Sequence, residues 1–478
     1  MQNLRFVSPT LAAALATFAV PTAFAQAPPP PPPERAPPPA TAPARAPATD
    51  DAPTPPPAPA PDATPPSAAT PLPPAPDATP PPAAASSSRA IAAAESFDEL
   101  EASLDASPAL TPRATAPSSP GGAPTSAGAT TSMNPEIAAI LDVAAAYFSE
   151  EDPLQAGAHD PNHTGFNWQQ LEIALGGVVD PYLRFDANLV FSPFGVEVEE
   201  AYATTLDLPL GLQSRFGQFL TRFGRFNATH PHSWNFADQP FQLGKLFGGE
   251  GQRGLGVELS VLLPLPWSVE LVGSATEAAG EATARSFFGA RDLGVQSAGD
   301  LLYTASVKQF NALSDDFSLA TGLSANFGPN ASGRDNRTEI YGADIYIKYR
   351  PVDEPEPPEV ALRSEWFYRR RQLPDLSLQD YGQFTELSYR FALRWAIAGR
   401  HELGSPSYDS DGTITTDPLD PEWIHTRQRG SASLSFFPTE FSRFRLQGSY
   451  DAPRYRDAIW AAFLTAEVVV GAHGAHQF

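Results

Sequence analysis

Apolar and polar residues alternate along the C-terminal part of the chain, with the period of two that is typical of β-strands with one apolar face. In residues 182–191, for example, Leu183 and Phe185 fall on one face, while Arg184 and Asp186 fall on the other. The pattern predicts sixteen strands, near residues 137–148, 168–178, 181–192, 196–207, 211–220, 252–263, 266–277, 300–312, 316–328, 338–350, 358–372, 380–390, 392–402, 424–437, 440–451 and 457–471.

The connections between these strands indicate how they are arranged, because a soluble β-sandwich shows the same alternation. Every second connection is short, as at 179–181 and 208–210, whereas most of the others are long and polar, as at 149–167 and 221–251. Short turns on one side and long loops on the other are typical of outer-membrane barrels. We therefore predict an all-β fold, a transmembrane antiparallel up-and-down β-barrel of about sixteen strands over residues 134–478, with both termini in the periplasm.

The last predicted strand gives a second, independent signal. Trp460, Leu464, Val468 and the terminal Phe478 share one parity, while Glu467 points the other way. A final strand with an apolar face and a terminal aromatic residue resembles the signal read by the barrel-assembly machinery. We therefore expect Phe478 to act as the membrane-assembly signal, with that machinery and outer-membrane lipid as partners.

The N-terminal third has a different composition. Residues 1–27 have the features of a secretory signal peptide, in which Arg5 precedes a short apolar run and Ala23-Phe24-Ala25 offers a small-x-small cleavage site. The run is shorter than the roughly 20 residues of a spanning helix, which argues against a membrane anchor. Residues 28–133 are rich in Pro and Ala, and we predict a disordered periplasmic linker.

Composition excludes several kinds of function. The chain has no cysteine, so disulfides, thiolate metal sites and cysteine nucleophiles are excluded. Its net charge of -23 argues against nucleic acid as a partner, because phosphates require a basic surface.

Three short motifs lie close together within residues 195–226. They are Glu200-Ala201-Tyr202, Arg215-Phe216-Gly217-Gln218-Phe219 and Phe223-Gly224-Arg225. They resemble the strand-turn-strand block of the outer-membrane porin superfamily, locally of its O and P type. The resemblance implies a channel and favours a homotrimer, although no ladder of basic residues indicates phosphate selectivity.

Two histidine motifs carry a second resemblance. The loop motif His230-Pro231-His232 and the tail Gly471-Ala472-His473-Gly474-Ala475-His476 are similar to those of outer-membrane proteins labelled zinc-regulated receptors. No segment resembles the plug domain of such receptors.

Charged residues on the inward face of a barrel with a water-filled lumen select the solutes that pass. Alternatively, such residues only brace the inner wall through ion pairs. By parity, the acidic inward residues include Glu258, Glu270, Glu365 and Glu467. We predict the following pore-lining residues: Arg184, Asp186, Arg215, Lys348, Arg363, Arg369, Arg371, Arg443 and Arg445.

The third connection on the long-loop side, residues 221–251, corresponds to the loop that narrows the lumen in many sixteen-stranded porins. It contains aromatic residues that could pack on the wall, and Pro240 favours a short helix within 237–247. An ordinary surface loop is the alternative. The candidate constriction residues are Arg222, Arg225, His230, His232, Asp238 and Lys245.

Histidine pairs offer the other possible chemistry. His159 and His163 lie in one long loop, and His230 and His232 lie in another on the same side, so the pairs could meet. A metal site needs three or four converging imidazoles or carboxylates. Loop histidines without a metal are common, and we therefore assign no metal and no cofactor.

These observations favour a porin-like outer-membrane channel for passive or weakly selective diffusion of small polar or ionic solutes. The alternative is an outer-membrane receptor or transporter for a metal or another nutrient, TonB-linked or not. A TonB-linked receptor needs about twenty-two strands and a plug. An enzyme on a smaller barrel would need a Ser, a His and a carboxylate near one rim, and no motif selects them, so we predict no enzyme.

Overall fold

The computed structural model describes residues 135–193, 195–291, 293–352 and 358–471. Within these residues sixteen strands form one closed antiparallel β-barrel, as predicted. The strands are β1 (Glu136–Phe148), β2 (Gly165–Asp180), β3 (Leu183–Ser192), β4 (Gly195–Thr205), β5 (Leu212–Leu220), β6 (Arg253–Leu262), β7 (Ser268–Glu277), β8 (Leu301–Ala312), β9 (Phe317–Asn330), β10 (Gly333–Tyr349), β11 (Glu359–Gln372), β12 (Ser377–Ala392), β13 (Trp395–Gly404), β14 (Arg427–Thr439), β15 (Ser442–Ala452) and β16 (Ile459–Gly471).

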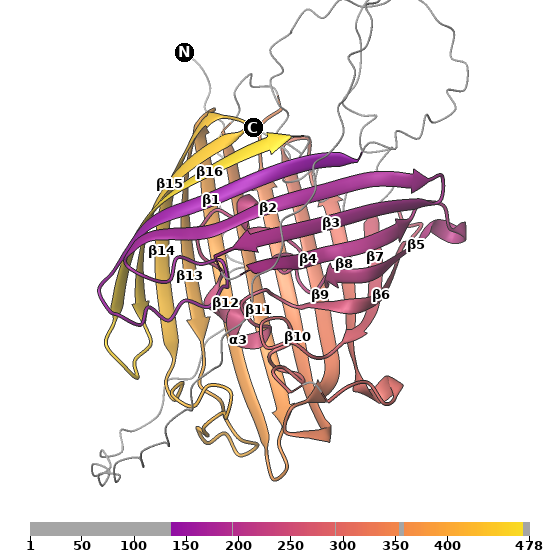
Figure 1. The fold of residues 1–478 in the computed structure, drawn as a ribbon, viewed down its shortest axis with the longest axis vertical. Helices are drawn as coiled ribbons and strands as arrows, with labels where there is room; N and C mark the ends of the chain where they lie inside the picture. Colours follow the sequence, from indigo (N-terminus) through magenta and orange to yellow (C-terminus); the bar gives the residue numbers. More distant parts are fainter. Residues whose placement is uncertain (1–134, 194, 292, 353–357, 472–478) are drawn as a thin grey trace, which may run out of the picture. The chain divides into compact units, whose positions relative to one another are not determined.

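Each strand pairs with its neighbours in sequence, and β1 pairs with β16 to close the ring (Figure 1). The closing pair runs from Ala138 opposite Gly471 to Phe148 opposite Ala461. Closure leaves no open sheet edge, and open edges are what promote aggregation of β-proteins.

The two faces of the wall differ as the alternation predicts. On β16, Trp460, Leu464 and Val470 are exposed on the outside, whereas Thr465 and Glu467 are buried inside. Exposed large apolar side chains occur on the outer face of strand after strand. The exterior is therefore apolar, and most charged side chains of the strands point inward.

The connections alternate in length, with some differences from prediction. The short side includes the two-residue turns at 181–182 and 393–394. The long side includes 149–164, 221–252, 278–300 and 405–426, but its 331–332 hairpin is also short because β9 and β10 extend further than the alternation indicated. The connections also contain the short helices η2 (Pro209–Gly211), η3 (Pro231–Ser233), α3 (Phe241–Leu246) and η4 (Ala298–Asp300).

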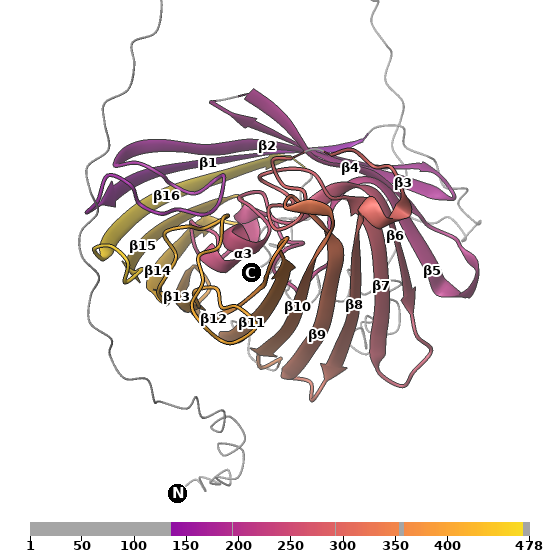
Figure 2. The same cartoon turned by 90° about the horizontal axis from the view of Figure 1, so that it is seen from below.

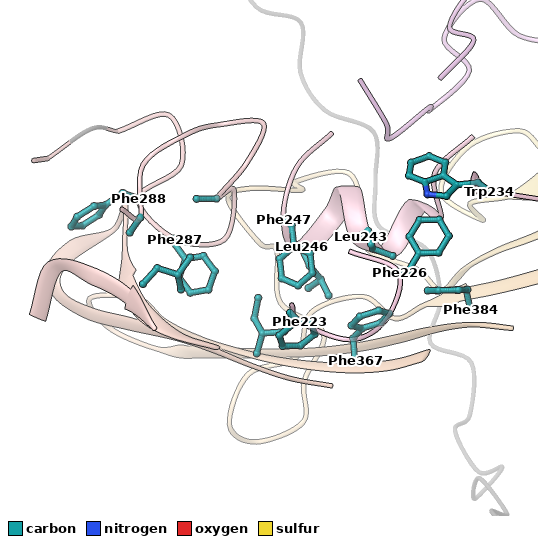
Figure 3. Close-up of a cluster of buried hydrophobic side chains, with 14 residues drawn as sticks. Phe223, Phe226, Trp234, Leu243, Leu246, Phe247, Phe287, Phe288, Phe367 and Phe384 are labelled. Carbon is teal, nitrogen blue, oxygen red and sulfur yellow. The ribbon is translucent and has the colours of Figure 1, made fainter. Parts of the chain in front are cut away.

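The interior differs from the expected water-filled tube, because long loops fold into it. Loop 3, residues 221–252, carries α3 into the ring of strands (Figure 2). Phe223, Phe226 and Phe247 of this loop pack with Phe287 and with Phe367 on the wall, in a buried apolar cluster (Figure 3). The helix predicted within 237–247 is confirmed: it begins at Phe241, directly after Pro240, and is six residues long.

Several predictions concern residues outside the described ranges. They include the signal peptide at 1–27, the linker at 28–133, the tail histidines His473 and His476, and the assembly signal Phe478. Among the residues that the structure describes, no helix combines the length and apolar character needed to cross a membrane.

Candidate functional site

Loop 3 crosses the barrel interior and bonds to the wall on its far side. The backbone amide of Gly224 donates to Ser324 Oγ at 2.9 Å, and that of Phe226 donates to Glu365 Oε1 at 2.7 Å. Further along the loop, the amide of Ala237 donates to Gln447 Oε1 at 2.7 Å. Wall side chains thus satisfy backbone donors of an irregular segment, which keeps the loop in place without a strand partner.

The predicted constriction residue Arg222 is buried at the start of loop 3. Its guanidinium lies 2.9 Å from Glu258 and 2.9 Å from Glu270. Arg225 is also buried and stacks on the Tyr346 ring, 4.3 Å from its centroid. Both cations therefore connect loop 3 to side chains of the wall.

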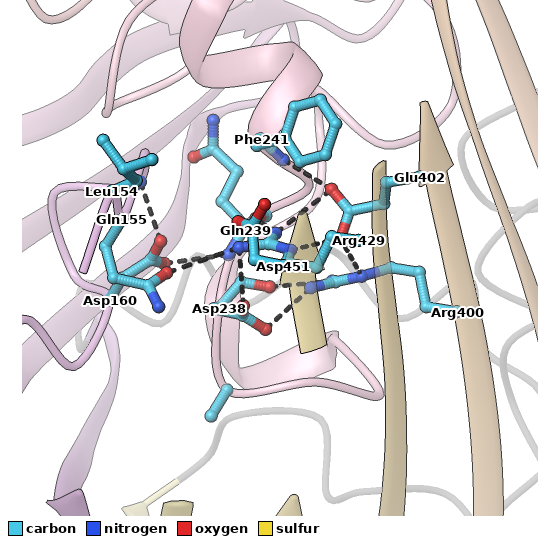
Figure 4. A network of polar contacts seen from close by, with 12 residues as sticks. Leu154, Gln155, Asp160, Asp238, Gln239, Phe241, Arg400, Glu402, Arg429 and Asp451 are labelled. Carbon is cyan, nitrogen blue, oxygen red and sulfur yellow. Dashed lines mark hydrogen bonds and ion pairs between the residues drawn. The ribbon is translucent and has the colours of Figure 1, made fainter. Parts of the chain in front are cut away.

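Asp238 and Lys245 hold the middle of the loop. Asp238 lies 2.7 Å from Arg400 and 3.1 Å from Arg429, and all three are buried (Figure 4). Burial alone would raise the pKa of Asp238, but the two guanidiniums outweigh burial and lower it below its ordinary value. Lys245 Nζ lies 2.7 Å from Asp380 Oδ2.

The first long loop takes part in the same network. Asp160 accepts from the amide of Gln239 in loop 3 at 2.8 Å and from that of Gly157 in its own loop at 2.8 Å. Burial and the neighbouring Asp238 raise the pKa of Asp160 to about 6. The two long loops are therefore joined at a buried carboxyl group.

The remaining predicted pore-lining residues are mostly paired. Arg369 lies 2.9 Å from Asp380 and 2.8 Å from Asp417, which belongs to the loop between β13 and β14. The other basic residues have these partners: Arg215 with Glu258, Lys348 with Glu359, Arg363 with Glu386, Arg371 with Asp417, Arg443 with Glu467, and Arg445 with the backbone oxygen of Trp234.

Arg184 and Asp186 also pair with each other, at 2.9 Å, but their side chains are 38% and 26% exposed. They line a cavity of about 240 Å³ together with Glu136, Glu200 and His230. Glu136 and Arg184 stand at the starts of β1 and β3, on the short-turn side of the barrel. The cavity therefore extends from that rim to loop 3.

Two of the predicted histidines meet a group of carboxylates at the inner end of this cavity. We call Glu172, Glu199, Glu200, His230 and His232 the His230 cluster. His230 Nδ1 lies 3.3 Å from Glu199 Oε2 and 3.9 Å from Glu172 Oε1, and His230 Nε2 lies 3.1 Å from Glu200 Oε2. His232 stacks on His230 at 5.7 Å between ring centroids, and its Nδ1 lies 3.4 Å from Glu172 Oε2.

Electrostatics favour positive charge at this point. Burial lowers the pKa of His230, but the carboxylates of Glu199 and Glu172 outweigh burial and raise it well above its ordinary value. His159, from the first long loop, lies beside the cluster, with Nε2 3.2 Å from Glu250 Oε2. The two loops do meet at His159, whereas His163 is exposed and contacts Asn162 of its own loop and Phe166 at the start of β2.

A β-bulge brings two consecutive carboxylates into the cluster. In the pairing of β3 with β4, Asn188 faces Glu200 while Leu189 faces Val198, so Glu199 is an extra residue. An inserted residue of this kind shifts the alternation, and here both Glu199 and Glu200 are buried inside. We did not predict Glu172, Glu199 or Glu200 as site residues, although the change in apolar parity between Val198 and Ala201 marks the bulge in the sequence.

The comparison with characterised families gave no matching family model. A protein of Aquifex aeolicus described as uncharacterized is 31% identical over 346 residues, which cover 66% of this chain and 70% of that protein. This chain belongs to the same family as the Aquifex protein. The relationship defines a family without indicating what its members transport or bind.

Solved structures with a similar fold include outer-membrane proteins. Pseudomonas putida OprB aligns with a TM-score of 0.48 and 11% identity, over 70% of this chain and 94% of that one. The outer membrane channel DcaP of Acinetobacter baumannii aligns with 0.47 and 12%, over 70% and 97%. An anion-selective porin of Comamonas acidovorans aligns with 0.46 and 9%, over 70% and 99%. Because these TM-scores are below 0.5, the barrel is assigned from the strand pairing of this chain itself. The resemblances to the O and P type and to zinc-regulated receptors stay predictions.

Proposed function

We propose that this protein is an outer-membrane channel for small polar or ionic solutes. The observation that carries the proposal is the closed barrel with an apolar outside and a charged inside. In water, so large an apolar surface would be unfavourable, whereas lipid accommodates it. Closure through β1 and β16 also leaves no open sheet edge to face the hydrocarbon of a bilayer.

The filled interior favours a narrow and selective passage over a wide pore. Loop 3 lies across the lumen as a constriction, and solutes passing it would meet fixed charges of both signs. The cavity lined by Arg184 and Asp186 would serve as the vestibule on the periplasmic side. No reacting group is needed for this role, so we infer a channel and not an enzyme.

Planar-bilayer recording of the purified protein tests the proposal directly. We expect stepwise conductance that is small compared with that of wide general porins, because loop 3 narrows the lumen. A barrel that inserts but never conducts would contradict the channel.

Replacing Arg222 with Ala tests the constriction. The substitution removes the cation that pairs with Glu258 and Glu270, so we expect the reversal potential to shift toward cation selectivity. Loss of the anchor should also increase conductance. Arg394→Ala, in an exposed short turn, is the matched control and should leave the reversal potential and the conductance unchanged. If reversal potential and conductance are both unaltered in R222A, the contacts of Arg222 with Glu258 and Glu270 do not determine the constriction.

We further propose a homotrimer in the membrane, as the porin resemblance implies. The outer face has a hollow of about 600 Å³ over β12 to β16, lined in part by Gly399, Gly430 and Gly448. Small residues there allow another wall to approach closely.

A further inference from the structure

We propose that the His230 cluster binds one divalent transition-metal ion of the Zn²⁺ class, with His230 Nδ1, Glu199 and Glu172 as ligands. The inference does not depend on the channel function, because it concerns binding alone. It rests on the spacing of the donors, their orientation, and the cavity that leads to them.

The spacing of the donor atoms suits a single ion. One nitrogen of His230 and one oxygen each of Glu172 and Glu199 lie within 4.8 Å of one another. Ligand bonds to Zn²⁺ are about 2.0–2.2 Å long, so tetrahedral ligand atoms stand roughly 3.3 Å apart. The measured 3.3 Å and 3.9 Å from His230 Nδ1 to the two carboxylates require only small side-chain rotations to reach that geometry.

The orientation of His230 separates a ligand nitrogen from a supporting one. Its Nε2 faces Glu200 Oε2 at 3.1 Å, which is the arrangement in which a carboxylate orients a metal-bound imidazole. Its Nδ1 faces Glu199 Oε2, and the two buried atoms lack hydrogen-bond geometry. Glu199 is only 4% exposed, and a buried carboxylate oxygen without a hydrogen bond is unfavourable. A metal ion between the two atoms would satisfy both.

The backbone is built to place these carboxylates. Glu199 is the bulged residue of β4, and regular alternation would have turned it or Glu200 outward. β4 also pairs with β5 only through residues 201–204, and side chains bridge the rest: Glu200 accepts from the amide of Leu220 at 2.6 Å. The bulge therefore interrupts the regular pairing of β4 and places two consecutive carboxylates inside the barrel.

An ion has a route to the site. The cavity of about 240 Å³ reaches His230 and is lined by the carboxylates of Glu136, Asp186 and Glu200 and by the guanidinium of Arg184. The excess of negative charge would concentrate cations there.

The neighbouring group of His159, Glu199 and Glu250 is a weaker candidate. His159 and Glu250 already form a close pair, and Arg253 lies 3.9 Å from Glu250 on the same carboxylate oxygen. A fixed cation so close to a ligand oxygen opposes a metal ion. We therefore assign the ion to Glu172, Glu199 and His230. An imidazole ligand favours Zn²⁺ or Co²⁺ over Mg²⁺ or Ca²⁺.

The experiment is a calorimetric titration of Zn²⁺ into chelator-treated full-length protein in detergent. All proteins carry H473Q and H476Q, so that tail histidines do not contribute. We expect one Zn²⁺ per chain, not displaced by excess Mg²⁺, and a Co²⁺ absorption band typical of four or five ligands. Glu200→Gln should weaken binding about 10- to 100-fold, as for other residues that orient a ligand. Glu199→Gln and His230→Gln should weaken it further.

His163→Gln and Glu422→Gln are the matched controls, since both side chains are exposed and outside the cluster. They should bind Zn²⁺ as the parent does. Heat-dependent migration on gels establishes that each variant is folded. If one cluster variant fails to fold, the Zn²⁺ affinities of the other cluster variants test the site. Absence of Zn²⁺ binding by the parent, or equal affinity in folded E199Q or H230Q, would overturn the proposal. Bilayer conductance is measured separately, so loss of metal binding and loss of channel activity are distinguishable.

Discussion

Charged side chains are buried inside this barrel. Burial of a charge is unfavourable because the charge loses its hydration, unless an ion pair offsets that loss. Arg400 is an example. Its guanidinium forms ion pairs with Asp238 at 2.7 Å and with Glu402 at 2.9 Å, and these offset the lost hydration. Removing one partner of a buried pair is strongly destabilising, because the other charge stays desolvated. The buried arginines therefore hold the loops in place through ion pairs with them.

Asp238→Asn tests this at the point where loop 3 meets Arg400 and Arg429. The amide keeps the shape and removes the charge, so we expect unfolding free energy to fall by about 3 kcal/mol at pH 7. The folded pKa of Asp238 is lowered, so its stabilisation is full above about pH 4 and is lost as the pH falls through the folded value. Wild type and D238N should therefore converge in acid.

Unfolding followed by tryptophan fluorescence in detergent provides the measurement. Asp375→Asn, in an exposed turn, is the control and should behave as wild type. Equal stability of D238N and wild type at pH 7 would show that the ion pairs of Asp238 with Arg400 and Arg429 contribute little to the free energy of unfolding.

At the scale of elements, the alternation of inward and outward side chains is interrupted in β4, at the bulge that contributes Glu199 and Glu200 to the His230 cluster. Its alternation places Val196 and Val198 outside, and the bulge then resets the parity so that Glu200 is also inside. Bulges commonly re-aim side chains at functional positions. The strand thus combines a lipid-compatible outer face with two adjacent inward carboxylates.

Deleting Glu199 tests the role of the bulge. The deletion restores uninterrupted pairing of β3 with β4 and leaves every other side chain on its present face. We expect the barrel to fold with normal heat-dependent gel migration and to lose Zn²⁺ binding. A barrel that cannot fold without Glu199, while E199Q folds and binds Zn²⁺, would mean that the bulge serves assembly alone.

At the scale of the whole molecule, the wall and its contents have separate roles. Sixteen strands close the cylinder, and the loops from the long side supply an apolar cluster within it. Outside, the hollow over β12 to β16 is the surface that we assign to contact between subunits.

Gly430→Trp tests that contact. A Cβ added at Gly430 meets nothing within 4 Å apart from its chain neighbours, so the variant chain should fold while its tryptophan obstructs a neighbouring subunit. We expect its trimer to dissociate in sedimentation velocity measurements in mild detergent. Gly273→Trp on β7 is matched, because that glycine is also exposed and open. A trimer that persists in G430W would place the subunit contact elsewhere.

The strands could be predicted from sequence because a single rule governs them: side chains alternate between lipid and interior. That rule located all sixteen strands and the inward parity of residues such as Arg369 and Glu467. It failed to identify Glu172, Glu199 and Glu200 as site residues, since a bulge and the path of loop 3 decide what those carboxylates meet.

The sequence by itself determined the barrel, its two faces and the alternation of its connections, because these follow from local periodicity and from turn length. Only the tertiary structure decided that loops fold into the interior, that Arg222 pairs with Glu258 and Glu270, and that His230 meets carboxylates of β2 and β4. Those outcomes depend on contacts between residues far apart in the chain, and no local pattern encodes the path of a loop across a lumen.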